Sequence, residues 1–272
     1  MSPRVSDRFL QASDLSFVPA EGEVRHHVSF ITGCIMGVAF ADAHRASLRV
    51  LARNGCEIRI PEQQGCCGAL HVHGGDREAA RELARRNIEA FEVHEDDAII
   101  INSAGCGSTL KEYGELLADD PVYAARAEAF SARVKDFSEY LHEIGPRTPT
   151  GAIAERVVYQ DACHLVHAQG ISQQPRDLLR AVPGIELVEM ENSTICCGAA
   201  GLYSVTDTEI SLSILGERLD ALEATGATIV VSANPGCLLH IQTGAQRRGL
   251  NLRVMHVAEF LDAAYDHEGS EA

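Results

Sequence analysis

Short runs of β-branched and aliphatic residues alternate along the chain with segments of helical periodicity. Three runs fall in each half, and each is bounded by polar residues or glycine: 27–32, 57–60, 98–101, 156–159, 185–188 and 228–231. Between the second and third runs, apolar residues recur at helical spacing around Ala84 and Ile88 and again around Leu215 and Leu219. Because strands that alternate with helices form parallel sheets with right-handed crossovers, this pattern predicts an α/β fold.

The sequence pattern indicates that the two halves are copies of one unit. Both end in similar segments, 134–141 and 254–261, and the first half carries roughly eleven extra residues near Asp119 and Pro121. Two prolines and two glycines in segment 145–151 predict a break between the copies. We therefore expect two tandem, pseudo-symmetric Rossmann-like domains. The predicted division is an arm or linker at 1–26, domains at 27–145 and 152–265 joined by a linker at 146–151, and a frayed tail at 266–272.

Cysteines repeat with the same duplication. Each half contains a single cysteine, then a Cys-Cys-Gly motif, then another single cysteine, and matching members are offset by 129, 130 and 131 residues. The first set is Cys34, Cys66, Cys67 and Cys106, and the second is Cys163, Cys196, Cys197 and Cys237. Thiols kept in register across a whole duplication indicate ligands rather than packing residues.

The single cysteines come soon after predicted strands. Because ligand sites in parallel sheets form beyond the carboxyl ends of the strands, where helices begin, each set is expected to converge on one edge of its sheet. Helix N-termini at that edge favour the thiolate, since backbone amides point at the sulfur.

Three interpretations of the eight thiols are considered. A disulfide framework is typical of small secreted proteins and fits this chain poorly. Structural zinc needs four ligands around one ion, usually with C-x2-C spacing, whereas here the paired cysteines are adjacent. Adjacent thiolates can bind two irons of one cluster, and four thiolates match a four-iron cluster. Iron–sulfur clusters of the 4Fe-4S type, one or two in number, are therefore preferred, with zinc in one half as the alternative.

The ninth cysteine and the histidines are less informative. Cys56 aligns with Ile185 of the second copy, so it is expected to be a core residue. His71, His73, His164 and His240 lie near the thiols and are candidates for a ligand or a hydrogen bond to sulfur, although surface positions are the commoner outcome.

Composition and charge limit the classes of function and partner expected for this chain. A net charge of −16 argues against nucleic acid or an anionic membrane surface as the main partner. No run approaches the roughly 18 apolar residues of a spanning helix, and the N-terminus lacks the layout of a secretory signal. These features favour the cytoplasm, where clustered cysteines indicate metal or redox chemistry.

The residues around the thiols resemble those of a known protein family. The two units resemble the cysteine-rich CCG domains found in heterodisulfide reductase and in related iron–sulfur proteins. Longer stretches are similar to the iron–sulfur subunit of glycolate oxidase: 62–76, 102–107, 111–114, 161–165, 196–201 and 234–238. That subunit begins with a ferredoxin-like region whose C-x2-C-x2-C-x3-C runs are missing from this sequence. The chain therefore looks like the CCG portion alone.

A second departure concerns the cluster type. Heterodisulfide reductase relatives end each unit with C-x2-C, whereas this sequence has Ser103 and Asn234 at the extra position. Four thiolates per unit remain, which favours a conventional cubane over the non-cubane cluster of those relatives.

The resemblance implies an electron-transfer subunit. A partner FAD-dependent 2-hydroxy-acid dehydrogenase of glycolate type would perform the substrate chemistry, and electrons would pass through this chain toward a quinone or other acceptor. A separate ferredoxin-like chain is a further implied partner. The alternatives are a zinc-stabilised or thiol-bearing assembly module that docks onto the dehydrogenase, and a catalytic subunit like that of heterodisulfide reductase.

Overall fold

The computed structural model describes residues 9–93 and 96–266 of the chain. It divides into two compact units, the first ending at Pro146 and the second beginning at Arg147. The division falls within the turn-rich segment 145–151. Part of the expected arm, residues 1–8, and nearly all of the expected frayed tail, residues 267–272, lie outside the described residues.

The first unit contains a five-stranded sheet in the order β1-β3-β2-β4-β5. Neighbouring strands from β3 to β5 pair in parallel, and β1 pairs antiparallel with β3 at one edge. The strands are β1 (Phe17–Val18), β2 (His26–Phe30), β3 (Cys56–Arg59), β4 (Ala98–Ile101) and β5 (Val134–Asp136). The helices are η1 (Ala12–Asp14), α1 (Ile35–Ala39), α2 (Ala41–Arg53), α3 (Ala69–His73), α4 (Arg77–Phe91), α5 (Ala104–Lys111), α6 (Tyr113–Leu116), α7 (Ala124–Arg133) and α8 (Phe137–Glu143).

The second unit contains an all-parallel sheet in the order β7-β6-β8-β9. Its strands are β6 (Arg156–Tyr159), β7 (Glu186–Val188), β8 (Ile229–Ser232) and β9 (Arg253–His256). Its helices are η2, a π-helical turn (His164–Ala168), α9 (Gln173–Arg180), α10 (Tyr203–Thr206), α11 (Thr208–Ala224), α12 (Pro235–Arg248) and α13 (Val257–Asp266). The predicted α/β class, with two Rossmann-like parallel sheets in tandem, is confirmed.

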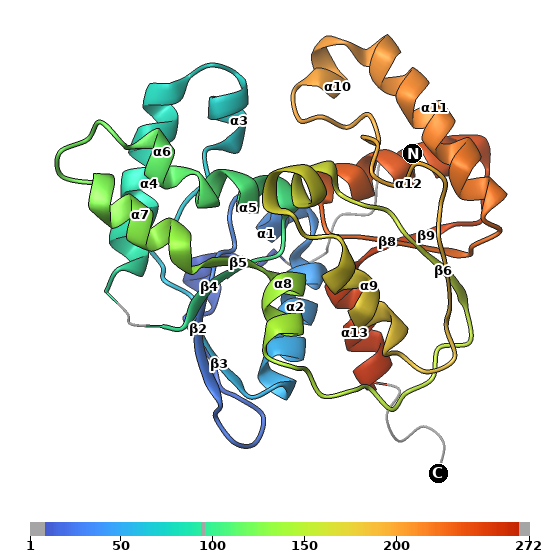
Figure 1. The fold of residues 1–272 in the computed structure, drawn as a ribbon, viewed down its shortest axis with the longest axis horizontal. Helices are drawn as coiled ribbons and strands as arrows, with labels where there is room; N and C mark the ends of the chain where they lie inside the picture. The colour runs from blue at the N-terminus through green and yellow to red at the C-terminus, as the bar shows by residue number, and fades with distance from the viewer. Residues whose placement is uncertain (1–8, 94–95, 267–272) are drawn as a thin grey trace. The chain divides into compact units, whose positions relative to one another are not determined.

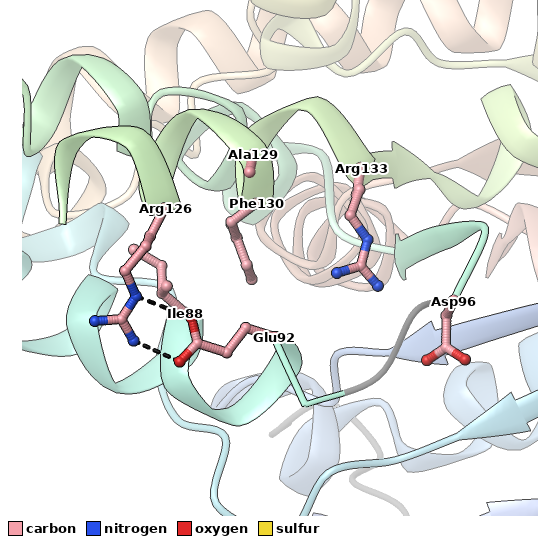
Figure 2. Close-up of a pocket in the computed structure, with 7 residues that line it drawn as sticks. All are labelled: Ile88, Glu92, Asp96, Arg126, Ala129, Phe130 and Arg133. Carbon is pink, nitrogen blue, oxygen red and sulfur yellow. Dashed lines mark hydrogen bonds and ion pairs between the residues drawn. The ribbon is translucent and has the colours of Figure 1, made fainter.

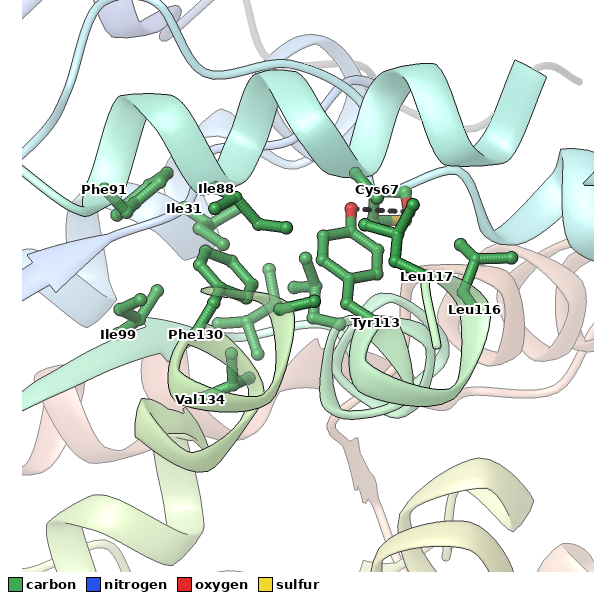
Figure 3. Packing of buried hydrophobic residues seen from close by; sticks show 14 of the residues in the cluster. Ile31, Cys67, Ile88, Phe91, Ile99, Tyr113, Leu116, Leu117, Phe130 and Val134 are labelled. Carbon is green, nitrogen blue, oxygen red and sulfur yellow. Dashed lines mark hydrogen bonds between the residues drawn. The ribbon is translucent and has the colours of Figure 1, made fainter. Parts of the chain in front are cut away.

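Helices cover both faces of each sheet. In the first unit α4 and α7 pack together on one face, and α2 and α8 lie on the other (Figure 1). In the second unit α11 packs with α12, and α9 with α13. The central strands β4 and β8 are buried along their whole length, as expected of strands covered on both faces. Figure 3 shows the first core, where Ile88 and Phe91 of α4 face Phe130 of α7.

Two features differ from a simple repeat. Phe17 and Val18, within the expected arm, form an edge strand because their backbone pairs with β3. The extra residues of the first unit break the crossover after β4 into α5, α6 and α7, where the second unit has the single helix α12.

Candidate metal centres

The thiols of the first unit meet at the carboxyl ends of β2 and β4. The chain leaves these neighbouring strands toward opposite faces of the sheet, and such a switch point opens a crevice for ligands. Cys34 precedes α1, and Cys106 lies in the first turn of α5. The loop after β3 carries Cys66 and Cys67 to the same place, with 3.7 Å between the Cys34 and Cys66 Sγ atoms. Hydrogen bonds then link Cys66 to Cys67 and Cys67 to Cys106.

The second unit repeats this arrangement at the switch point between β6 and β8. Cys163 precedes the π-helical turn η2, and Cys237 lies in the first turn of α12. Hydrogen bonds link Cys163 to Cys196, Cys196 to Cys197 and Cys197 to Cys237. The structure thus brings together the four members of each set. The same order of contacts holds in both units.

The thiols of each set differ in pKa. The pKa values of Cys66 and Cys196 are well below the usual range because two neighbouring thiols donate hydrogen bonds to each sulfur. Those of Cys106 and Cys237 are also lowered, chiefly by a hydrogen bond from the second cysteine of the motif. The donating thiols have raised pKa values: Cys34, Cys67, Cys163 and Cys197. Along each set, sulfurs with a raised pKa therefore alternate with sulfurs with a lowered pKa.

The glycine of each Cys-Cys-Gly motif has a backbone conformation that only glycine adopts easily. Gly68 has φ +81° and Gly198 has φ +91°, both in the left-handed region. The turn aims each glycine N–H at the first sulfur of the motif, 3.5 Å from Cys66 Sγ and 3.4 Å from Cys196 Sγ. The two glycines differ in how much room a side chain would have. A Cβ at Gly198 would lie 2.5 Å from the Ser211 carbonyl oxygen, whereas one at Gly68 would meet its nearest atom at 3.4 Å.

Gly198→Ala is expected to lower the free energy of unfolding by about 2–4 kcal/mol, because left-handed strain and steric overlap add. Gly68→Ala introduces the left-handed strain without the steric overlap and is expected to lower the free energy of unfolding by about 1–2 kcal/mol. Thermal unfolding of metal-free protein, followed by circular dichroism, measures both. Equal losses for the two variants would contradict the steric difference.

Ser103 and Asn234 are hydrogen-bond donors to the last cysteine of each set. Asn234 Nδ2 lies 3.4 Å from Cys237 Sγ, and the Ser103 hydroxyl helps to lower the pKa of Cys106 after the larger effect of Cys67. These two residues occupy the position that carries an extra cysteine in the C-x2-C relatives. Here that position donates a hydrogen bond to the last sulfur of the set instead of adding a further thiol.

Buried polar side chains, none of them among the residues predicted from the sequence, hold the first motif loop. Asn87 of α4 accepts from Gly65 N at 2.8 Å and donates to the Cys66 carbonyl at 3.0 Å. The Tyr113 hydroxyl donates to the Cys67 carbonyl at 2.8 Å, a contact drawn in Figure 3. A polar residue three positions after the apolar Ala84, on the buried face of the helix, is the signal that could have revealed Asn87.

The histidines lie in four different settings. His164 Nδ1 is 3.5 Å from Cys163 Sγ, so this side chain does contact a thiol. His240 Nε2 is 3.3 Å from the Ser211 hydroxyl, beside the motif glycine. His71 lies 3.6 Å from the cap residue Asp76, and His73 is exposed at the end of α3. Cys56 is fully buried in β3, in agreement with its expected core role.

Within residues 9–93 and 96–266, no group of three or more His, Cys, Asp or Glu side chains is placed to hold a metal ion. The thiols contact one another pairwise instead. The fit of an iron–sulfur cluster accordingly rests on donor chemistry: four sulfur atoms at each sheet edge, with backbone and side-chain donors directed at them. Such all-sulfur sets suit iron–sulfur clusters and zinc alike.

A cavity of about 440 Å³ lies away from the thiols, between α4 and α7 (Figure 2). Its lining includes the apolar Ile88 and Phe130, and an ion pair with N–O distances of 2.9 and 2.5 Å joins Arg126 to Glu92. No cysteine lines this cavity.

Fold and site together define a tandem α/β protein with one four-thiol centre in each unit. A family model described as "Cysteine-rich domain" (CCG) matches residues 28–111 and 157–242, and the chain belongs to this family. Both matches span the thiols of one unit.

Two relatives extend this result. The chain is 43% identical over 258 residues to the "Probable glycolate oxidase iron-sulfur subunit" of Bacillus subtilis, across 93% of this chain and 58% of that relative. It is 34% identical over 236 residues to "Lactate utilization protein A" of Halalkalibacterium halodurans, across 86% of this chain and 96% of that relative. The chain thus spans little more than half the length of the first relative and nearly all of the second.

The fold is also seen in a solved structure. A hypothetical protein from Helicobacter pylori superposes with a TM-score of 0.58 at 8% identity, across 93% of this chain and 52% of that one. At this identity the likeness concerns the fold alone.

Proposed function

We propose that the chain is an iron–sulfur electron-transfer subunit of a complex that oxidises a 2-hydroxy acid such as glycolate or lactate. The observation that carries the proposal is the pair of four-thiol sets, each at the switch point of its own sheet. The names of the relatives, a glycolate oxidase iron–sulfur subunit and a lactate utilization protein, support the substrate class.

Each unit would hold one cluster, most simply of the four-iron type, since four thiolates are its usual complement. The ligands would be Cys34, Cys66, Cys67 and Cys106 in the first unit and Cys163, Cys196, Cys197 and Cys237 in the second. When bound, the clusters supply one-electron transfer. The chain's own residues bind them, orient the sulfurs and tune them through the N–H groups of Gly68 and Gly198 and the side chain of Asn234.

The substrate chemistry would belong to partners. An FAD-dependent dehydrogenase subunit would oxidise the hydroxy acid and pass electrons to this chain, which would hand them to a quinone or to a separate ferredoxin-like chain. The proposed location is the cytoplasm. Among the described helices, none has both the length and the hydropathy needed to cross a bilayer.

The proposal is tested by reduction through the partner. The chain is reconstituted anaerobically with iron and sulfide and mixed with an FAD-dependent glycolate or lactate dehydrogenase from the same organism. Addition of the hydroxy acid is expected to produce the electron paramagnetic resonance (EPR) signal of a reduced cluster, and omission of the dehydrogenase to abolish it. Loaded protein that the dehydrogenase never reduces would refute the assignment.

A further inference from the structure

Arg218 is a buried cation beside the second thiol set. It lies on the inner side of α11 with 4% of its surface exposed. Its Nη2 donates to the carbonyls of Ile195 and Asn192 at 2.8 and 2.9 Å, and Nη1 lies 3.6 Å from Met190 Sδ. Ile195 directly precedes Cys196, so the guanidinium is anchored to the loop that carries the adjacent cysteines.

This cation has no carboxylate partner in the part of the chain that the structure describes, and its Nε has no hydrogen-bond partner there. Asp161, a nearby carboxylate, is engaged by Arg176 through two bonds of 2.8 and 2.7 Å. Burial lowers the pKa of Arg218, and the thiols of the motif, Cys197 foremost, are the main groups that counteract this. The guanidinium is therefore a buried charge without an ion pair among the described residues, and two backbone carbonyls hold it against the cysteine loop.

The first unit has a neutral residue at the corresponding place. A Cβ added to the motif glycine would lie nearest to Ala80 of α4 in the first unit and to Ser211 of α11 in the second, and Asn87 and Arg218 follow these two residues by the same seven positions. Both side chains donate to a carbonyl of the motif loop. Arg86 also donates to that loop in the first unit, but it is exposed, so solvent screens its charge. At this position the two units thus differ by one buried positive charge.

We propose that Arg218 gives the second centre a higher reduction potential than the first, so that electrons entering the chain accumulate there. A cluster gains negative charge on reduction, and a buried cation nearby stabilises the reduced state. Arg218 acts here as a positioning and tuning residue rather than as a ligand. The inference rests on the proposed function, because both units must hold a cluster.

The test is a potentiometric titration of full-length reconstituted chains, monitored by EPR. In a Cys67→Ala background, which retains only the second centre, Arg218→Gln is expected to shift the one-electron equilibrium at least tenfold toward the oxidised form, about 59 mV. Arg218→Lys keeps the charge and is expected to keep most of the potential. Arg180→Gln removes an exposed cation from the same unit and is expected to leave the potential unchanged.

The potentials of the two centres are also compared in proteins that keep Arg218. The Cys67→Ala protein, with only the second centre, is expected to titrate at a higher potential than the Cys197→Ala protein, with only the first. The reverse order, or equal potentials for Arg218→Gln and its parent, would overturn the inference while leaving the proposed function intact. Unsubstituted protein that takes up no iron would overturn both.

Discussion

Cys197→Ser is expected to remove the iron and sulfide of the second unit and leave the first unit loaded, so that about half the total remains. Cys197 is buried and hydrogen-bonds to both Cys196 and Cys237, at the centre of its set. A hydroxyl is a poor ligand for iron in such a cluster, so the remaining three sulfurs are not expected to retain it. Iron and acid-labile sulfide are measured per chain after anaerobic reconstitution.

Cys67→Ser is expected to produce the converse loss in the first unit, because Cys67 holds the same central place there. Cys56→Ala is the matched control. It removes a buried cysteine of the same unit that lies within β3 and outside the thiol set. Full loading of Cys197→Ser, or a similar loss in Cys56→Ala, would contradict the assignment of the ligands.

Arg176→Met is expected to destabilise the second unit by about 3–5 kcal/mol, because it leaves Asp161 buried without its charge partner. Asp161 is 1% exposed and receives two hydrogen bonds from the guanidinium, which also contacts Glu189 at 3.1 Å. The same cation lies 5.2 Å over the ring of Tyr159. Since Asp161 precedes Cys163 by two residues, the pair also fixes the start of the thiol loop.

Native-state hydrogen exchange of metal-free protein measures this loss strand by strand. The amides of β6 and β8 are expected to lose protection, while those of β2 and β4 in the other unit keep it. Arg180→Met is the control on the same helix, since Arg180 forms only exposed ion pairs worth less than about 1 kcal/mol. Equal effects of the two substitutions would show that the buried pair contributes little.

The predicted strands correspond closely to those observed, because continuous apolar runs such as 98–101 and 228–231 are what a sheet covered on both faces requires. Strand β1 could not be predicted, since two residues carry no periodicity and its existence depends on pairing with β3. The division of one crossover into α5, α6 and α7 was visible only as extra length.

The candidate thiols could be selected from the sequence because the duplication keeps them in register. The residues that support these thiols could not be selected from the sequence. Asn87 and Arg218 reach motif carbonyls about 20 residues away along the chain, and only the packing of helix against loop shows that they are equivalent. The contact between Arg176 and Asp161 likewise depends on how α9 folds back onto the end of β6.

Mössbauer spectroscopy of the anaerobically purified, iron-57-labelled chain, with sulfide and zinc measured on the same sample, tests the central claim most directly. We expect about four irons and four sulfides for each unit, with the quadrupole doublets of cubane clusters and no stoichiometric zinc. Zinc bound at one ion per unit, without acid-labile sulfide, would contradict it.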